Sequence, residues 1–418
     1  MGAPTRRRRT VVSHGQQSTP GATSQLLKLI GIGLAVVLVA GLGVVGYVAT
    51  NWLGTINSNA VAIDGTEDLP PDIAALEGGF DILLTGVDTC EEKYKKYFGD
   101  RCTGPDAANT LNDVNLLVHV SDEPRRITAV SFPRDLGVPI PECADVEGNT
   151  RSSMTKASLN VAYQHGGDGG GLNCVAKTIS DLTGQDIEFA ASVTFGGVIE
   201  ITDAIGGVEV CLATPIIDSQ TGLNMKAGDH TIQGLQALQF LRTRHGVGDG
   251  SDLGRIGNQQ QYMSSLVRKL LSSDTLSNVP VMLKLADTGL NNLEASTSLA
   301  DPMKIVQIGL AVKDVAYEDI VFLQYPALDD PQDSAKVVPD YATADAMWAA
   351  ILENKQLQVT HESTASDGVI VKDEPVETGA PATPAPTESA GSDVIALPPS
   401  IKGSSAAQQT CSNGKTYR

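Results

Sequence analysis

Three apolar runs lie close together in the sequence: DILLTGV at 81–87, DVNLLVHV at 113–120 and RITAVSFP at 126–133. Each is short, rich in branched aliphatic side chains and bounded by polar residues, which is typical of a strand buried in a sheet. Similar runs predict further strands at 186–194 and 207–212. Together these segments predict a central β-sheet.

Helical patterns alternate with these strands. In MTKASLNVAYQHGG (154–167), apolar residues recur at helical spacing and two glycines provide a stop signal. Further helices are predicted at 173–183, 197–205, 234–243 and 259–272, the last with a single apolar stripe. This alternation of strands and helices predicts the α/β class, as an α/β/α sandwich with a central mixed β-sheet.

The charge distribution separates a basic head from an acidic body. The 418 residues include 30 Lys+Arg and 49 Asp+Glu, a net charge of −19, yet the first 50 residues carry the four arginines at 6–9 and Lys28 but no acid. A strongly acidic chain lacks the basic surface that phosphate-backbone binding requires, so we expect no nucleic-acid partner. With 41% hydrophobic residues, a wholly disordered chain is excluded.

Residues 29–50 form an almost continuous apolar segment without a charged residue. About 20 such residues span the hydrocarbon core of a bilayer as a helix, whereas the apolar core of a cleaved signal peptide has roughly 7–15. We therefore expect one retained transmembrane helix, with a cleaved signal as the alternative. The positive-inside rule then predicts a cytoplasmic basic tail at 1–28 and an extracellular body anchored in the cell membrane.

The remaining segments differ in composition. A polar stalk is expected at 51–76, and the Pro-, Ala-, Thr- and Ser-rich stretch 361–418 predicts a disordered tail. Between them lies the folded body. No linker separates residues 276–360 from the part before them, so we assign them to that body; a small attached lobe is the other interpretation.

All six cysteines follow the apolar segment, which agrees with export to an oxidising compartment. No C-x-x-C pair is present, which argues against a zinc or thioredoxin-type centre. We favour pairing of Cys90 with Cys102 and of Cys143 with Cys174, because each bond would close a polar, glycine-bearing excursion between apolar strands. The full connectivity stays open, and free buried thiols are the alternative.

Arginines cluster in FLRTRHGVGDGSDLGR (240–255), at and after the end of a predicted helix. Clustered cations repel one another unless an anion is bound, and Arg242, Arg244 and Arg255 could grip phosphate oxygens in bidentate fashion. A surface salt-bridge network with the abundant acids is the alternative. His245 adjoins the cluster and could help a substrate hydroxyl to lose its proton.

Polar residues flank the predicted strands. SFPRD (131–135) follows an apolar strand, so Arg134 could join the arginine cluster at the sheet edge where α/β proteins bind ligands. Asp88 directly follows one strand and Asp113 directly precedes another. Two carboxylates near an arginine-bound pyrophosphate suit Mg²⁺, which takes one or two carboxylates plus substrate phosphates. Taken alone, either aspartate could instead be a turn residue or a helix cap.

The order of these motifs resembles the LytR-CpsA-Psr family of bacterial cell-envelope proteins over residues 78–275. Seven segments carry the resemblance, in family order: DILLTGVD (81–88), NDVNLLVHV (112–120), ITAVSFPRDL (127–136), SLNVAY (158–163), DAIGGVEVCL (203–212), AGDHTIQGLQALQFLRTRH (227–245) and DLGRIGNQQQ (252–261). A basic N-terminus, one anchor and an exported body also fit the layout of that family. The Gly- and Pro-rich composition with abundant Ala and Val suggests an actinobacterial member.

The resemblance implies an LCP-like catalytic domain at 77–275 that acts as a phosphotransferase. Family members take a glycan from a polyprenyl-pyrophosphate carrier, move it as glycan-1-phosphate onto a peptidoglycan hydroxyl and release polyprenyl phosphate. The lipid would lie in an apolar tunnel of the body. Phosphoryl transfer needs positioning and charge neutralisation more than covalent catalysis, so the lack of an evident nucleophile–base pair in the sequence is expected.

The resemblance also implies roles for individual residues. Asp88 and Asp113 would hold Mg²⁺ on the pyrophosphate, and Asp135 would orient Arg134. The catalytic residues that it implies are Arg134, Asp135, Arg242, Arg244 and Arg255, and the substrate-binding residues are Lys156, Asn160 and Gln259.

Three positions depart from the family pattern. Leu111 and Asn258 stand where the family often has arginine, and Ser158 stands where it usually has lysine. Fewer cations would weaken pyrophosphate binding, because each charged hydrogen bond contributes about 1.5–3 kcal/mol. Two rival functions therefore stay open: a non-catalytic protein that binds polyprenyl lipid or wall polymer, and a membrane-tethered envelope regulator that works through its tails.

Overall fold

The computed structural model describes residues 60–61, 76–105, 107–250, 252–271, 286–360, 368–372 and 394–415, all within one compact unit, Ile56–Arg418. The predicted cytoplasmic tail and transmembrane segment, and most of the predicted stalk, lie outside the described residues. Within the described ranges, no helix combines the length and the apolar character needed to cross a bilayer.

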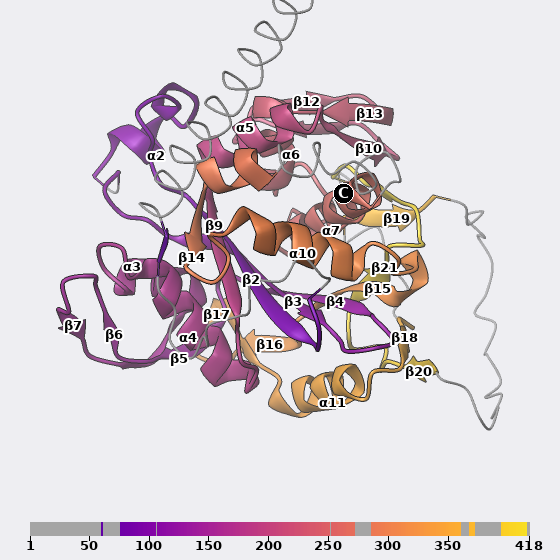
Figure 1. The fold of residues 1–418 in the computed structure, drawn as a ribbon. Helices are drawn as coiled ribbons and strands as arrows, with labels where there is room; N and C mark the ends of the chain where they lie inside the picture. Colours follow the sequence, from indigo (N-terminus) through magenta and orange to yellow (C-terminus); the bar gives the residue numbers. More distant parts are fainter. Residues whose placement is uncertain are drawn as a thin grey trace, which may run out of the picture. The chain divides into compact units, whose positions relative to one another are not determined.

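A mixed sheet of eight strands forms the centre of the unit (Figure 1), in the order β1-β14-β9-β2-β3-β4-β15-β21. The pairs β2/β9 and β4/β15 run parallel, whereas β2/β3 and β3/β4 run antiparallel, which confirms the predicted mixed sheet. The strands are Ala60–Val61 (β1), Leu293–Ser296 (β14), Phe189–Thr194 (β9), Phe80–Val87 (β2), Asn112–Val120 (β3), Ile127–Phe132 (β4), Ile320–Gln324 (β15) and Gly403–Ser405 (β21).

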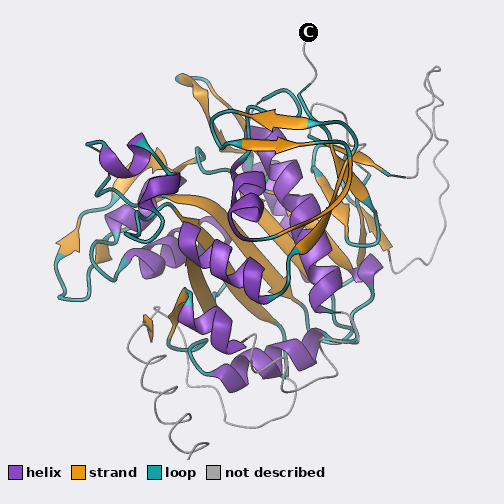
Figure 2. Cartoon of the chain, turned by 90° about the horizontal axis from the view of Figure 1, so that it is seen from above, coloured by secondary structure: helices purple, strands orange, loops and turns teal. Residues whose placement is uncertain are grey.

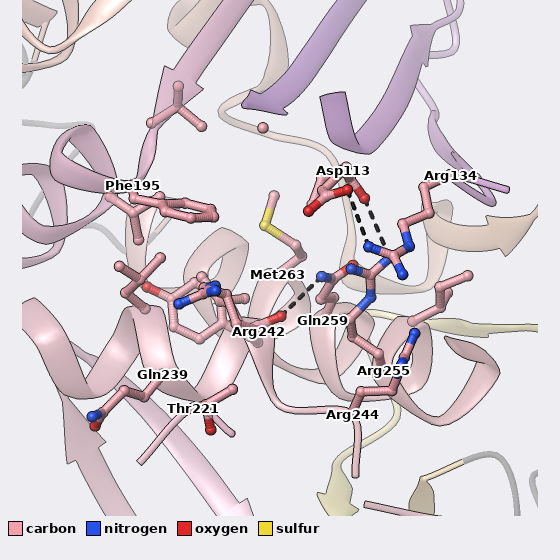
Figure 3. Close-up of a pocket in the computed structure, with 18 of the residues that line it drawn as sticks. Asp113, Arg134, Phe195, Thr221, Gln239, Arg242, Arg244, Arg255, Gln259 and Met263 are labelled. Atoms are coloured by element: carbon pink, nitrogen blue, oxygen red, sulfur yellow. Dashed lines mark hydrogen bonds and ion pairs between the residues drawn. The ribbon is translucent and has the colours of Figure 1, made fainter. Parts of the chain in front are cut away.

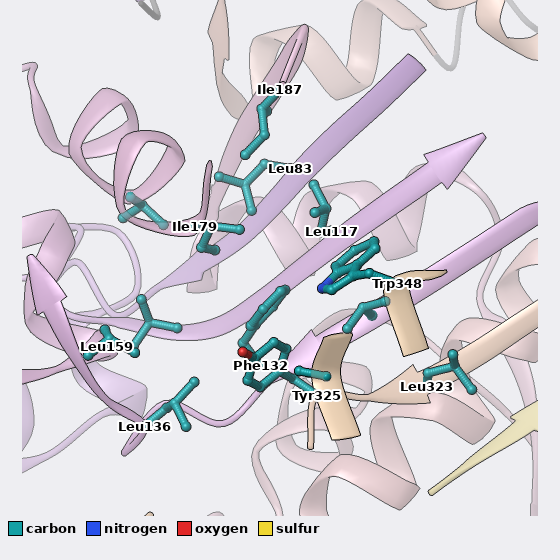
Figure 4. Packing of buried hydrophobic residues seen from close by; sticks show 14 of the residues in the cluster. Leu83, Leu117, Phe132, Leu136, Leu159, Ile179, Ile187, Leu323, Tyr325 and Trp348 are labelled. Carbon is teal, nitrogen blue, oxygen red and sulfur yellow. The ribbon is translucent and has the colours of Figure 1, made fainter. Parts of the chain in front are cut away.

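Helices cover both faces of this sheet. Successive side chains of a strand point to opposite sides, so each buried strand packs one set of apolar side chains against each layer of helices. On one face, Leu83, Leu117 and Val130 pack with α4 (Gly171–Thr183) and α11 (Tyr341–Leu352) in a buried core (Figure 4).

The neighbouring side chains build the opposite face. Leu84, Leu116 and Ala129 belong to a second cluster with residues of α7 (Asp252–Leu270) and the end of α10 (Pro302–Val312). Layers of helices therefore lie above and below the sheet, as Figure 2 shows from a second direction. This arrangement is the predicted α/β/α sandwich.

A smaller sheet, in the order β13-β10-β22-β19, packs its apolar side on α6 and α7. It supports the two helices that carry the arginine-rich segment. Its strands are Gly228–Ile232 (β13), Val208–Leu212 (β10), Thr410–Ser412 (β22) and Val369–Val371 (β19), and the neighbouring helices are Phe195–Ala204 (α5) and Gly234–Arg242 (α6).

Short strand pairs and single helical turns complete the unit. The pairs are Gly137–Ile140 (β5) with Met154–Ser158 (β8), Cys143–Ala144 (β6) with Thr150–Arg151 (β7), Ile216–Asp218 (β11) with Leu223–Met225 (β12), Ala327–Asp330 (β16) with Asp333–Pro339 (β17), and Gln356–Gln358 (β18) with Val394–Ala396 (β20). The short helices are Lys95–Tyr97 (η1), Asp100–Thr103 (α2), Leu159–Val161 (η2), Ala162–His165 (α3) and Tyr317–Asp319 (η3).

The helix predicted at 154–167 is wrong in its first part. Residues 154–158 form β8, which pairs with β5, and helical structure begins only at Leu159. Pairing with β5 satisfies the backbone of this segment, and this tertiary contact overrides a weak local helical pattern. The helix predicted from residue 259 is longer than expected, because α7 begins at Asp252.

The predicted tail, 361–418, is also corrected, because four of its short segments form β19, β20, β21 and β22. The average composition of residues 361–418 is polar and Pro-rich, so it gave no sign of these short strands. Each strand needs few apolar residues because it pairs with a strand that other parts of the chain already hold in place. The central sheet likewise gains β1 from the predicted stalk and β14 and β15 from residues 276–360. The described part of this segment, residues 286–360, therefore contributes two strands to the same sheet as the segments before it.

Three disulfide bonds cross-link the unit. Cys90–Cys102 and Cys143–Cys174 confirm the favoured pairings, and Cys211–Cys411 joins β10 to β22 across 200 residues of sequence. No cysteine is left free among the described residues, so the alternative of free buried thiols is excluded. A bond that closes so long a loop restricts the unfolded chain strongly, and disulfides typically contribute about 2–4 kcal/mol.

Candidate active site

A cavity of about 1030 Å³ lies between one face of the central sheet and the helices α5, α6 and α7. The sheet contributes Leu84, Leu116, Ala129 and Phe322 to its wall. These are side chains of the α7-facing side, so the cavity takes the place of part of the packing between sheet and helices. Figure 3 shows the arginines that converge on it.

The wall changes from charged to apolar along the elements that build it. On α7, Arg255 precedes Leu266 by a helical rise of about 16 Å. On β3, Asp113 lies at the strand start and Leu116 further along. We call the part formed by Asp113, Arg134, Arg242, Arg244 and Arg255 the charged end, and the part formed by Leu84, Leu116, Ala129, Met263, Leu266 and Phe322 the apolar end.

Arg134 follows β4 and points toward Asp113 (Figure 3). Its Nη1 lies 3.2 Å from Oδ1 of Asp113, and its Nε lies 3.3 Å from Oδ2 of Asp135. The backbone N–H of Asn160 donates to the Arg134 carbonyl oxygen at 3.0 Å and holds the turn in place. Contacts of this kind fix the direction of the guanidinium.

Arg255 and Gln259 reach the same region from the first turns of α7. The Nη2 of Arg255, a residue only 7% exposed, donates to the backbone oxygen of Asp113 at 3.2 Å. The Nε2 of Gln259 donates to the carbonyl oxygen of Leu241 at 2.9 Å and so ties α7 to α6. The start of a helix also carries partial positive charge, which adds to the attraction for an anion.

Arg242, the last residue of α6, lies against two neighbouring aromatic rings. Its guanidinium carbon lies 4.4 Å from the ring centroid of Phe195 and 5.3 Å from that of Phe98. Burial lowers the pKa of Arg242, against the charges of Asp113 and Asp88, which raise it. An arginine side chain stays protonated even so, and the cavity wall therefore holds a desolvated cation whose edge can still donate to an anion.

Arg244 also lines the cavity. Its backbone N–H donates to Oδ2 of Asp218 at 3.1 Å, and its Nη2 lies 3.4 Å from Nε2 of His245. His245 also lines the cavity. The structure thus brings together the arginines that sequence reasoning grouped, with the imidazole next to them.

Asp88 lies behind this wall and does not line the cavity. It is 5% exposed, its Oδ2 accepts from Nε of Arg101 at 2.7 Å, and its Oδ1 accepts from the backbone N–H of Leu111 at 2.7 Å. Arg101 itself lines the cavity. Sequence reasoning gave Arg101 no role, although closure of the Cys90–Cys102 loop could have indicated that it returns to Asp88.

Two predicted substrate-binding residues are not brought to the cavity wall. Lys156 points elsewhere, with Nζ 2.7 Å from Oδ2 of Asp330, because β8 is a strand rather than the predicted helix. Asn160 contributes its backbone to the Arg134 turn but does not line the cavity. In this structure Lys156 therefore contacts Asp330 instead of the cavity wall, and its substrate-binding role stays a prediction.

The departures from the family pattern have structural explanations at two positions. Asn258 is fully buried; its Nδ2 donates to the Phe240 carbonyl oxygen at 2.8 Å, and its Oδ1 accepts from the Ser412 hydroxyl at 2.5 Å. It joins α7 to α6 and β22 rather than facing the cavity. Ser158 pairs with Gly137 in the β5/β8 hairpin.

The C-terminal segment also braces the loop between Arg244 and Arg255. The backbone N–H of Gly248 donates to the Asn413 oxygen at 3.0 Å, and that of Lys415 donates to the Gly246 oxygen at 2.8 Å. The arginine-bearing loop is therefore held by residues from the predicted tail.

The carboxylates of the site fit a magnesium ligand set only in part. Asp113 lines the cavity as a carboxylate that is 22% exposed beside the arginines, which suits an ion that completes its shell with water and substrate phosphates. Both Asp88 oxygens already accept hydrogen bonds, although a carboxylate has further lone pairs. Within the described part of the chain, no group of three or more His, Cys, Asp or Glu side chains could hold a metal by itself.

Comparison with known proteins gives a consistent result. The LytR_cpsA_psr family pattern matches residues 54–355. The Corynebacterium glutamicum protein named cell wall biosynthesis protein LcpA is 29% identical over 310 residues, which cover 71% of this chain and 58% of that protein. The chain thus spans little more than half the length of this curated relative. Its source agrees with the actinobacterial origin suggested by composition.

Two Bacillus subtilis proteins are also similar. The polyisoprenyl-teichoic acid–peptidoglycan teichoic acid transferase TagT is 26% identical over 293 residues, which cover 68% of this chain and 81% of TagT. The crystal structure of TagV is 20% identical, covers 66% of this chain and 97% of its own, and superimposes with a TM-score of 0.49.

Proposed function

The chain belongs to the LytR-CpsA-Psr family, and on that premise we propose that it moves a glycan-1-phosphate from a polyprenyl-pyrophosphate carrier onto peptidoglycan. The observation that carries this proposal is the division of one cavity into a charged end and an apolar end. A polyprenyl-pyrophosphate donor has the same division, with a dianionic head on a long hydrocarbon chain.

The charged end supplies what phosphoryl transfer needs. Arg242, Arg244 and Arg255 can donate to the pyrophosphate oxygens, while Arg134 is oriented by Asp113 and Asp135. These fixed donors neutralise charge that spreads over the phosphoryl oxygens in the transition state. Asp113 would hold Mg²⁺ together with Asp88, which lies further from the cavity, and the ion would neutralise further charge on the pyrophosphate.

In the proposed reaction, the acceptor hydroxyl oxygen attacks the phosphorus that bears the glycan. The new oxygen–phosphorus bond forms as the bridging bond of the pyrophosphate breaks, and the hydroxyl proton is released. Polyprenyl phosphate leaves with the bond electrons. No covalent enzyme intermediate is required, so a site made of arginines and carboxylates is sufficient.

We further propose an extracellular body anchored by a single transmembrane helix at 29–50, with its N-terminus in the cytoplasm. The charge pattern around that segment supports this topology. A lipid-linked donor also requires a site near the membrane surface.

The test uses the full chain in detergent, with Mg²⁺, a polyprenyl-pyrophosphate-linked saccharide and peptidoglycan fragments. Mass spectrometry should detect polyprenyl phosphate together with a glycan-1-phosphate adduct on the fragments, and Arg242→Ala should remove both. Arg151→Ala is a matched control, because this exposed arginine lies outside the cavity wall.

Other outcomes separate the rival functions. Tight lipid binding without release in any condition would favour the non-catalytic binding protein. An envelope phenotype that survives Arg242→Ala but is lost on deletion of 1–28 would favour the membrane-tethered regulator. Release without an adduct would indicate pyrophosphatase activity or a wrong acceptor.

A further inference from the structure

The loop closed by the Cys90–Cys102 bond makes two separate contacts with charged groups of the site. Phe98 stacks on Arg242, and Arg101 pairs with Asp88. We propose that Phe98 and Arg101 are positioning residues of the phosphotransfer site, which are delivered by this loop; the proposal rests on the function proposed above.

Arg101 fixes Asp88 at several points. Besides the ion pair to Oδ2, its Nη2 donates to the Asp88 backbone oxygen at 3.1 Å and to the Asn109 backbone oxygen at 2.5 Å. One guanidinium thus clamps the end of β2 to the segment that leads into β3 and Asp113.

Phe98 acts on the second charged group. The Phe98 and Phe195 rings lie 4.9 Å apart, and the guanidinium of Arg242 lies against both. Contact with the rings holds the Arg242 guanidinium in place, and a guanidinium in such a contact can still donate N–H groups to phosphate oxygens.

The loop packs on α5 through a buried cluster of side chains. Tyr94, Phe98 and Cys102 are buried in one cluster with Phe195 and Ile199. This cluster gives the loop its own small core.

Polar contacts add to this core. The Glu91 carboxylate accepts from the Gly196 backbone N–H at 2.7 Å, and Tyr94 donates to Glu200. A Cβ at Gly196 would collide with Glu91 and Tyr94, so the loop can dock only because residue 196 is glycine.

The test measures binding and turnover separately in the full chain. Binding of geranylgeranyl pyrophosphate is followed by calorimetry, and turnover by polyprenyl phosphate release. We expect Phe98→Ala to weaken binding of this probe by between about twofold and thirtyfold, and Phe98→Tyr to restore it. Arg101→Ala should lower kcat or raise the Mg²⁺ concentration for half-maximal activity by about 10–100-fold, with partial recovery in Arg101→Lys.

Two further variants make the result interpretable. Gly196→Ala should reproduce both losses while it leaves Phe98 and Arg101 in the sequence, because it displaces the loop that carries them. Lys96→Ala, a change of an exposed residue in the same loop, should leave both readouts unchanged. Melting temperatures identify variants that fail to fold.

The proposal is overturned if folded Phe98→Ala and Arg101→Ala variants bind and turn over like the parent. It is also overturned if every loss follows a fall in melting temperature and the conservative variants give no recovery. A parent chain that binds the probe without any turnover would refute the transferase function instead, while the Phe98 binding comparison would still test the loop.

Discussion

The charged end and the apolar end of the cavity are formed by many of the same strands and helices, but they differ in how many residues each depends on. Strands β3 and β4 and helix α7 each place a charged residue near one end and apolar residues further along. The charged end depends on a few charged side chains, each held by contacts of its own, whereas the apolar end is a surface shared by residues of four strands and α7. Single substitutions should therefore damage the charged end severely and the apolar end only moderately.

Next to the complete loss of product expected for Arg242→Ala, the largest effect is expected for Arg244→Ala at the charged end. Loss of one fixed donor to developing charge typically lowers kcat by about 10²–10³-fold, and the fold should survive because the side chain is only half-buried. Steady-state release of polyprenyl phosphate and a melting curve measure the two quantities. Unchanged kcat in a folded variant would remove Arg244 from the mechanism.

A smaller effect is expected for Asp113→Asn, which tests whether the proposed Mg²⁺ ion binds at this carboxylate. The neutral amide weakens both the contact to Arg134 and any bond to Mg²⁺, so about 10–100-fold more Mg²⁺ should be needed for half-maximal activity. Titration of activity with Mg²⁺ after EDTA treatment measures this. Full activity of the parent in excess EDTA would contradict a metal requirement.

At the apolar end, Ala129→Leu should narrow the cavity without touching the charges. Displacing two buried methylene groups of the lipid costs about 0.8 kcal/mol each, so KM for a long polyprenyl donor should rise about tenfold while kcat stays the same. Ala346→Leu, on the exposed side of α11, is the size-matched control. A loss of kcat instead of a rise in KM would mean that the two ends are not independent.

The smallest effect is expected for Lys156→Ala, a cation outside the cavity wall. Its contact with Asp330 involves a partly exposed ammonium group, and such ion pairs contribute about 0–1 kcal/mol. KM for the donor should change less than about twofold. A tenfold rise would restore the substrate-binding role predicted from the sequence.

The difference between the charged end and the apolar end also explains which site residues could be predicted from the sequence. Arg134, Arg242, Arg244, Arg255 and Gln259 all line the cavity, because they lie in short motifs at strand and helix ends whose positions follow from local patterns. The three strands at 80–132 and the mixed sheet were predictable for the same reason.

The other features of the site could not be predicted, because they depend on contacts between segments that are distant in the sequence. Arg101 reaches Asp88 only after the Cys90–Cys102 loop closes, and Phe98 reaches Arg242 only after that loop docks on α5. Lys156 leaves the site because of pairing with β5, which no local pattern reveals. The apolar end could not be listed in advance, since it takes alternate residues from several strands and their order in the sheet was unknown.

The place of β22 has a consequence for how the protein is made. Cys411 and Cys211 are 200 residues apart, so β10 is synthesised about 10–40 s before its partner strand at translation rates of 5–20 residues per second. Until then, Asn258 and Gln261 on α7 lack Ser412, and the loop between Arg244 and Arg255 lacks its C-terminal brace. We therefore expect a nascent or truncated chain that ends before residue 410 to carry every predicted catalytic residue and still be inactive, which delays catalytic competence until residues 410–415 have been synthesised and have folded.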